Sequence, residues 1–200
     1  GVRVNVCPRS DSHYGIESGM FAIEAAQRHG INPGLSVDNE TSYSTDMFME
    51  MRVAFYLQRV MGMHQQQCCD SEHALKTLPA AQLLKAATLD GAACAGMQDK
   101  VGSLTPGKQA DLVLINTSDI NLYPSGNAFG TVVHAAERSN IVTVMIGGRI
   151  VKQNGKVLGV DSTRLRAAID ESREHLFAAS GYQPDNFADT FLPLEQARLA

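Results

Sequence analysis

Apolar and polar residues alternate at the start of the chain in a pattern typical of a β-strand. The run VRVNVCP, Val2–Pro8, is rich in valine and ends at a proline. In ESGMFAIEAAQRHG, Glu17–Gly30, apolar residues recur at helical spacing and the terminal glycine provides a stop signal. A second apolar run, Gly34–Val37, predicts another strand that ends at Asp38. The order strand, helix, strand is typical of a parallel α/β unit.

The next amphipathic segment predicts a longer helix, which completes a second βα unit. Thr45 or Asp46 is a suitable N-cap, and the helix is expected to extend to about Gln66. The residues that recur on one stripe of this helix are Phe48, Met51, Phe55 and Arg59. Its methionines are Met47, Met49, Met51, Met61 and Met63. They favour core packing over a promiscuous binding face.

The pattern changes behind an alanine-rich helix predicted for Ala80–Gly96. Turn-forming residues then precede DLVLI, Asp111–Ile115, a run typical of a buried strand. Short strands are predicted in TVVHAA, IVTVMIGG, RIVKQNG and KVLG, with Gly-Gly and Asn-Gly pairs as hairpin turns. Asp161 or Ser162 caps a last helix. The residues at helical spacing in that helix are Leu165, Ile169, Ser172 and Leu176.

Composition and charge limit the classes of protein that fit this pattern. Of the 200 residues, 44% are hydrophobic and 19% are charged, which is typical of a globular protein with a core. A net charge of −4 without a Lys/Arg cluster argues against a nucleic-acid partner. No apolar run reaches the ~18 residues of a membrane span, and the N-terminus has no signal-peptide pattern. We therefore expect a cytoplasmic protein without nucleic-acid or membrane partners.

Asp38 lies where the second apolar run gives way to a polar loop. The segment DNETSYST that follows is longer than the usual connection of about two to six residues between a strand and a helix. In parallel α/β proteins, catalytic side chains gather at the carboxyl ends of the strands. Asp38 is therefore a candidate catalytic residue. The competing interpretation is a turn-forming residue at the end of the strand.

Four segments together resemble the amidohydrolase superfamily. They are VNVCPRSDSHYG, GLSVDNETSYSTDMFMEMRVAFYLQR, LLKAATLDGAACAG and VGSLTPGKQADLVLIN, and they occur in the order seen in that family. The similarity is to the branch of aminohydrolases that act on ring C–N bonds, such as triazine hydrolases and purine or pyrimidine deaminases. It covers about residues 2–160. Its most specific element is Gly102–Val113, which in the family enters a small β-sandwich beside a barrel.

The resemblance implies an α/β fold made of the last strands and helices of a metal-dependent (β/α)8 barrel and part of the flanking β-sandwich. It assigns residues 1–100 to the barrel, residues 101–160 to the β-sandwich, and residues 161–200 to a C-terminal helix and tail. The family's His-x-His pair on the first strand is missing, because the six histidines include no i, i+2 pair. The chain is therefore expected to be the C-terminal portion of a larger enzyme.

The resemblance also implies a metal site at Asp38. This residue matches the family aspartate that binds the metal and takes a proton from the attacking water. The metal would be zinc or iron, which share these ligands in the family. A catalytic zinc normally has three protein ligands, and Asp38 has no visible histidine partners. This chain alone is therefore expected to hold no metal, although the full-length enzyme would hold a divalent one.

The same resemblance implies substrate contacts on both sides of Asp38. Cys7–His13 would form the loop after the seventh barrel strand, where Ser10, Asp11 and His13 would touch substrate. The alternative is a solvated loop stiffened by its proline. Asn39 is a further candidate for a substrate contact, although it departs from the small residue or glycine that often follows the aspartate in this family.

Two functional hypotheses follow. The leading one is the C-terminal portion of a metal-dependent hydrolase of non-peptide C–N bonds, which deaminates a purine, pyrimidine or triazine-like ring with metal-activated water. It expects a small heterocyclic substrate, a homo-oligomer, and no activity in the isolated chain. The alternative is a truncated, non-catalytic association module of the same fold. An in-frame His-x-His roughly 200 residues upstream would support the enzyme, whereas a start codon beside Gly1 would support the module.

Overall fold

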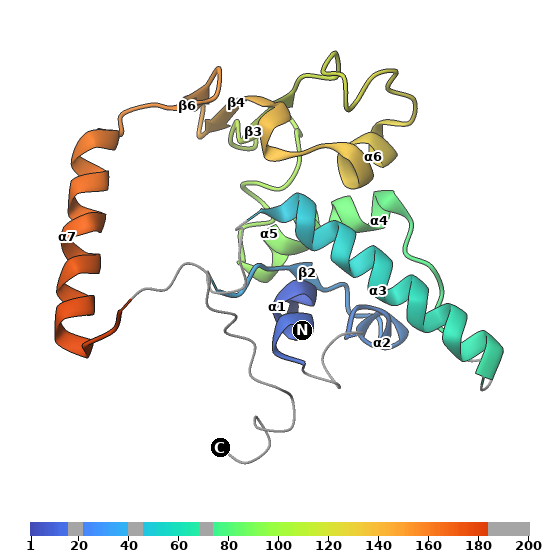
Figure 1. Cartoon of the computed structure of the whole chain (residues 1–200). Coiled ribbons are helices and arrows are strands. Elements are labelled where there is room, and N and C mark those ends of the chain that lie inside the picture. Colours follow the sequence, from blue (N-terminus) through green and yellow to red (C-terminus); the bar gives the residue numbers. More distant parts are fainter. Residues whose placement is uncertain (16–21, 40–45, 69–73, 184–200) are drawn as a thin grey trace. The chain divides into compact units, whose positions relative to one another are not determined.

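The computed structural model describes residues 1–15, 22–39, 46–68 and 74–183 (Figure 1). The chain forms two compact units, Gly1–Leu158 and Gly159–Ala200. The first unit contains a short parallel sheet with its helices, followed along the chain by a four-stranded antiparallel sheet. In the second unit, the described residues form one long helix. No helix within the described ranges is long and apolar enough to cross a membrane.

The front of the chain forms the predicted pair of parallel strands. Strand β1 (Asn5–Val6) pairs with β2 (Gly34–Leu35), which places Asn5 opposite Gly34 and Val6 opposite Leu35. Helix α2 (Ala22–Arg28) lies between them in sequence, and the start of the predicted helix, residues 17–21, falls outside the described residues. Both strands are shorter than predicted. A backbone hydrogen bond from Ser36 N–H to the Val6 carbonyl continues the pairing beyond them.

Two long helical segments pack against this sheet. Helix α3 (Met47–Cys68) confirms the predicted long helix, and Asp46 caps it by accepting a hydrogen bond from the Met49 N–H at 2.9 Å. The segments α4 (Ala80–Lys85), η2 (Ala86–Asp90) and α5 (Gly91–Cys94) follow one another directly and confirm the alanine-rich helix. A Cβ added to Gly34 would lie 2.9 Å from the Gly91 Cα, so this close approach of helix and strand requires glycine.

One hydrophobic core joins the strands to the helices. Its buried members are Val6, Ile23, Leu35, Met51, Ala54, Leu78, Leu83, Ala86 and Val133. Among the methionines of α3, Met51 lies in this core and Met47 packs against it, whereas Met49 and Met63 are exposed. The core-packing prediction for these methionines therefore holds for one face of α3 only.

The segment Cys7–His13, predicted as a loop, is mostly helical. Helix α1 (Pro8–Tyr14) begins with its proline at the first helical position and ends at Gly15, which has a left-handed backbone. Proline suits that position because the N–H it lacks has no partner within the helix. The prediction of a loop was therefore wrong. The start signal, Pro8, and the stop signal, Gly15, are both present in the sequence, and they enclose a helix of 7 residues.

A second correction concerns TVVHAA, which is helical and not a strand. Helices α6 (Ala128–Gly130) and η3 (Thr131–Ala135) are continuous, and Asn127 caps them by accepting the Gly130 N–H at 2.9 Å. Val133 is completely buried in the core, and the His134 ring packs edge-on against Phe55 of α3. Tertiary contacts with α3 therefore override the β-propensity of the adjacent valines.

Arg52 anchors α3 to this helical segment through two hydrogen bonds to backbone carbonyls. Its Nε donates to the Val133 carbonyl at 3.2 Å and its Nη2 donates to the Ala136 carbonyl. Both acceptor residues are fully buried, so Arg52→Met should lower the free energy of unfolding by about 1–3 kcal/mol. Urea denaturation measures the loss. Arg59→Met on the same helix is the control and should cost less than about 1 kcal/mol, because Arg59 is exposed and contacts only the Phe55 ring in the described structure.

The antiparallel sheet contains β3 (Leu112–Ile115), β4 (Ile141–Ile146), β5 (Arg149–Gln153) and β6 (Lys156–Val157), in that spatial order. As predicted, β3 pairs with β4 and not with the front strands. Gly147-Gly148 and Asn154-Gly155 form the predicted turns with positive φ at all four residues. Val113 and Leu114 of β3 are about half exposed, so the prediction of a buried strand is wrong for the chain as described. The short η4 (Arg138–Asn140) leads into β4.

The second unit contains α7 (Ser162–Ser180), which confirms the last predicted helix. Asp161 caps it by accepting the backbone N–H groups of Thr163 and Arg164, and Gly181 ends it in a left-handed conformation. No residue of α7 is buried, and Leu165, Ile169 and Leu176 are exposed within this unit. Most of the predicted tail, residues 184–200, lies outside the described residues.

Candidate active site

The carboxyl ends of β1 and β2 bring two polar segments together. Parallel strands end at the same edge of a sheet, so the segment after β1 meets the segment after β2 there. The first segment is the start of α1, with Ser10 and Asp11, and the second contains Asp38 and Asn39. All four residues are site residues predicted from the sequence, and the structure brings them into one cluster.

Two side chains hold the carboxylate of Asp38 by one of its oxygens. Ser10 Oγ donates to Asp38 Oδ2 at 2.6 Å, and Asn39 Nδ2 donates to the same oxygen at 2.8 Å. Ser10 is 1% exposed, whereas Asp38 is exposed. Among the residues that the structure describes, none donates a hydrogen bond to Oδ1. The carboxylate is thus oriented through Oδ2, and within the described ranges Oδ1 is left available to a further group.

The backbone at Asp38 has an uncommon conformation. Its φ is 64°, and the Asn39 N–H donates to the Val37 carbonyl at 2.9 Å, which closes a three-residue γ-turn centred on Asp38. The Asp38 N–H donates in turn to Ser36 Oγ at 3.2 Å. Positive φ is uncommon outside glycine, and such residues concentrate at functional sites. This local conformation supports the interpretation of Asp38 as a functional residue.

A buried ion pair below this cluster was not predicted. Glu50 of α3, which is 0% exposed, accepts hydrogen bonds from the Arg9 N–H at 3.3 Å and from Arg9 Nε at 2.7 Å. The Arg9 side chain is itself 11% exposed. The available signal was the position of Glu50 on the stripe that buries Met51, Ala54 and Gln58, where a carboxylate needs a partner.

The groups around Asp38 have perturbed pKa values. Burial, and to a smaller extent the negative charge of Asp38, raises the pKa of the Asp11 carboxyl. Burial also raises the pKa of the Cys7 thiol, against a hydrogen bond with Ser36 that lowers it, and the nearby carboxylates add to the rise. A raised pKa disfavours the reactive thiolate, so we expect Cys7 not to act as a nucleophile. The two aspartates repel one another, and a bound cation would offset that repulsion.

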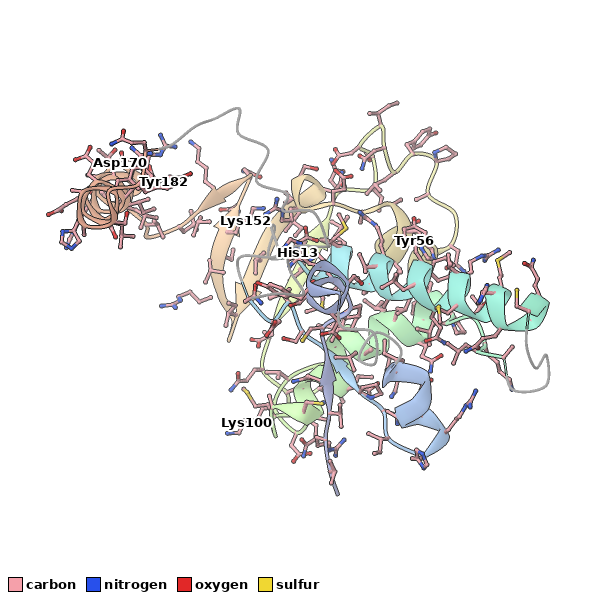
Figure 2. All side chains as sticks on the ribbon, turned by 60° about the horizontal axis from the view of Figure 1, so that its bottom comes forward. His13, Tyr56, Lys100, Lys152, Asp170 and Tyr182 are labelled. Carbon is pink, nitrogen blue, oxygen red and sulfur yellow. The ribbon has the colours of Figure 1, made fainter. Side chains whose placement is uncertain are left out.

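His13 is the remaining predicted site residue. It lies in the last turn of α1 and is exposed (Figure 2). Its ring is edge-on to the Tyr14 ring at a centroid distance of 5.1 Å. Its position after β1 places it on the same helix as Ser10 and Asp11. The structure does not join it to Asp38 by any described hydrogen bond, and its substrate contact stays a prediction.

The cluster around Asp38 offers few ligands to a metal ion. Within the described ranges, no group of three or more His, Cys, Asp or Glu side chains could hold a metal ion. A catalytic zinc normally has three protein ligands, and this cluster supplies one Asp38 oxygen, Oδ1, to which no described residue donates. The residues therefore fit one ligand of a metal centre and do not make a complete one.

Comparison with known proteins yields a family model and a consistent set of relatives. The model described as "Amidohydrolase family" matches residues 1–151. Two relatives are 5-methylthioadenosine/S-adenosylhomocysteine deaminases. That of Syntrophomonas wolfei is 29% identical over 175 residues, which cover 87% of this chain and 38% of that protein. That of Desulfitobacterium hafniense is 30% identical over 170 residues, which cover 84% of this chain and 37% of that protein. The chain thus spans well under half the length of these relatives.

Solved structures agree with this comparison. An adenosine deaminase from Xanthomonas campestris with bound zinc superposes with a TM-score of 0.77 at 30% identity, over 89% of this chain and 38% of that one. An atrazine chlorohydrolase from Arthrobacter aurescens, complexed with zinc, superposes with a TM-score of 0.73 at 20% identity, over 86% of this chain and 36% of that one. The second likeness shows the fold alone. Together they confirm the predicted fold class, part of a (β/α)8 barrel with a flanking β-unit.

Proposed function

Because this chain belongs to the amidohydrolase family, we propose that it is part of a longer, metal-dependent hydrolase that deaminates an amino-substituted heterocycle. The relatives named as deaminases support hydrolysis of a C–N bond. Because the chain covers only 38% of such a relative, the proposed activity is that of the longer protein. The proposed enzyme is cytoplasmic and homo-oligomeric, with a small-molecule substrate.

The observation that carries this proposal is the arrangement of Asp38. Its carboxylate emerges from a γ-turn at the carboxyl end of β2, is held through Oδ2 by Ser10 and Asn39, and leaves Oδ1 without a described donor. A turn-forming aspartate would use its carboxylate on nearby backbone N–H groups instead. The carboxylate of Asp38 accepts from side chains on both sides of the site, which favours the catalytic interpretation over the turn-former.

The proposed chemistry assigns a proton transfer to Asp38. When bound, a divalent metal would supply a water molecule with a lowered pKa, and Asp38 would be one of the residues holding it. The carboxylate of Asp38 takes a proton from the attacking water and delivers it to the leaving amine nitrogen. The ring carbon thereby exchanges its amino group for oxygen, and ammonia is released. Ser10 and Asn39 keep the carboxylate aligned during both transfers.

The proposed substrate class is an aminopurine. The deaminases from Syntrophomonas wolfei and Desulfitobacterium hafniense and the zinc-bound structure at 30% identity are all named for adenosine compounds. The triazine hydrolase likeness rests on 20% identity and speaks for the fold only. Zinc is the proposed metal because the adenosine deaminase structure at 30% identity contains bound zinc. Iron is the alternative that the family's ligand set allows.

The experiment that tests this function uses the complete gene product. We expect ammonia release from at least one adenosine-type nucleoside in a panel that also contains aminopyrimidines and amino- and chloro-triazines. A chelator should abolish the activity, and zinc or ferrous iron should restore it. Absence of ammonia from every member of the panel, with the metal-loaded protein, would contradict the proposal.

The alternative function, a non-catalytic association module, is supported by one observation. The antiparallel sheet presents apolar side chains to solvent in the described chain. They are Val113, Leu114, Ile146, Ile150 and Val157. Exposed apolar patches and open strand edges favour association with another chain. This surface is compatible with both functions, because a homo-oligomeric enzyme would also use it.

Self-association of the 200-residue chain is the corresponding prediction. We expect sedimentation velocity to show a species larger than a monomer at micromolar concentrations, because the half-exposed β3 residues lose contact with water on association. Leu114→Lys should shift the distribution towards the monomer. Leu104→Lys is the matched control, since Leu104 is 79% exposed outside the sheet and its replacement should leave the distribution unchanged. A monomer at all concentrations would contradict the prediction.

A further inference from the structure

We propose that the buried Arg9–Glu50 pair positions Asp38 and acts on it through Ser10. The inference rests on the proposed function, because it assigns a further role within the same site. It makes Arg9 and Glu50 positioning residues, since neither of them hydrogen-bonds to Asp38 in the described structure.

The first step is the connection between α3 and α1. Cys7 occupies the N-cap of α1 and makes no side-chain capping bond. Glu50 supplies the missing acceptor from another helix, because its Oε2 accepts the Arg9 N–H at 3.3 Å while Oε1 accepts Arg9 Nε at 2.7 Å. The first backbone N–H groups of a helix have no partner within it. Glu50 therefore fixes the start of α1 through both the backbone and the side chain of Arg9.

The second step is the connection between α1 and Asp38. Ser10 follows Arg9 directly, is 1% exposed, and donates to Asp38 Oδ2 at 2.6 Å. A shift of the Arg9 backbone moves Ser10 with it, because the two residues share a peptide plane. The position of the Asp38 carboxylate therefore depends on Glu50 through two consecutive residues. Asn39, the other donor to Oδ2, belongs to the same loop as Asp38, and its Nδ2 also donates to Ser10 Oγ at 3.4 Å, so this link to α1 runs through Ser10 as well.

The third step is that stability alone does not account for this pair. Glu50 is completely buried, and burial raises the pKa of its carboxyl against the lowering effect of Arg9. Arg9 Nη2 is buried without a hydrogen-bond partner in the described part of the chain. A buried ion pair with an unpaired donor is commonly no more stabilising than apolar residues of the same size. Its position, one residue from the donor to Asp38, favours a geometric role.

A double-mutant cycle in the complete gene product tests the connection. Glu50→Ala and Ser10→Ala should each lower kcat for the deaminated substrate by about 10- to 100-fold, because small misplacements of a catalytic group have effects of that size. KM of Glu50→Ala should stay within about threefold, because the completely buried Glu50 is bonded to Arg9 and is not expected to touch substrate. The double variant should lose no more than the larger single loss. Losses that add in free energy would overturn the proposal.

Gln58→Ala is the matched control. Gln58 lies on α3 as Glu50 does, is 2% exposed, and donates from its side chain to the Lys76 carbonyl. We expect a comparable fall in thermal stability with kcat within about threefold of wild type, because Gln58 has no connection to α1 in the described structure. An equal fall in kcat would mean that any loss of packing on α3 has this effect, and the positioning role would be wrong. If Glu50→Ala does not fold, Glu50→Gln replaces it, since glutamine keeps an acceptor but loses the charge that holds Arg9.

A crystal structure of the Glu50 variant separates this proposal from the proposed function. The Ser10 Oγ to Asp38 Oδ2 distance of 2.6 Å should lengthen beyond hydrogen-bonding range. An unchanged contact would overturn the positioning role whatever the enzyme does. A lengthened contact, in a protein that releases ammonia from no substrate, would support the positioning of Asp38 and overturn deamination alone.

Discussion

Asp38→Asn in the complete gene product should lower kcat by at least about 100-fold and leave the fold intact. The size of the loss is that of removing a general base, since the amide cannot take a proton from the attacking water. The fold should survive because the asparagine Oδ1 can still accept from Ser10 Oγ, and because asparagine tolerates the φ of 64° found here. Ammonia release measures kcat, and circular dichroism with thermal melting measures the fold.

Asp99→Asn is the control for this substitution. Asp99 is an exposed aspartate in the turn after α5, and its replacement should leave kcat unchanged. The melting temperature of Asp38→Asn should not fall, because the Asp38 charge contributes to the raised pKa of Asp11 and its removal relieves that repulsion. Wild-type activity in Asp38→Asn would show that the aspartate is only a turn-forming residue. In the isolated chain, where no activity is expected, the same change should have no effect on turnover.

Leu83→Ala should have the largest effect on stability, with a loss of about 2–5 kcal/mol in the free energy of unfolding. Leu83 of α4 is 1% exposed and belongs to the core that joins Val6, Leu35 and Met51. Truncation removes buried apolar surface and leaves a cavity that the helices and strands around it can fill only in part. Urea denaturation, followed by circular dichroism, measures the change in midpoint.

Leu89→Ala provides the comparison within the same helical run. Leu89 of η2 is 39% exposed, so its truncation should cost less than about 1 kcal/mol. A loss at Leu83 no larger than that at Leu89 would mean that the core is not continuous across α4 in solution. It would also contradict the packing of the helical run on β2.

The candidate site could be predicted in part from local sequence signals, which marked Asp38, and in part from the family resemblance. An apolar run that ends in an acidic residue marks the end of a strand, and parallel strands place such ends at one edge. The family resemblance implied that Ser10, Asp11 and Asn39 lie beside Asp38, and the structure brings them next to it. The catalytic and substrate-binding roles of these residues stay predictions until turnover is measured.

Other parts of the site depended on contacts between distant segments. The Glu50–Arg9 pair connects residues 41 positions apart, and nothing local to Arg9 indicates its partner. The carboxylate was visible in sequence on the buried stripe of α3, but a stripe does not show which element covers it. The γ-turn at Asp38 was likewise not predicted, because its φ follows from the hydrogen bonds of Ser36 and Val37 around it.

The sequence by itself determined the order of the elements, the parallel pairing of β1 with β2, the hairpins and the place of Asp38 after the second strand. The elements and hairpins depend on residues that are neighbours along the chain, through periodicity, caps and turn residues, whereas the parallel pairing follows from the order strand, helix, strand. Only the tertiary structure decided that TVVHAA is helical, because the burial of Val133 against α3 outweighs the β-propensity of its valines. It also decided that Val113 and Leu114 are half exposed, because an apolar run shows what a strand can bury and not what covers it.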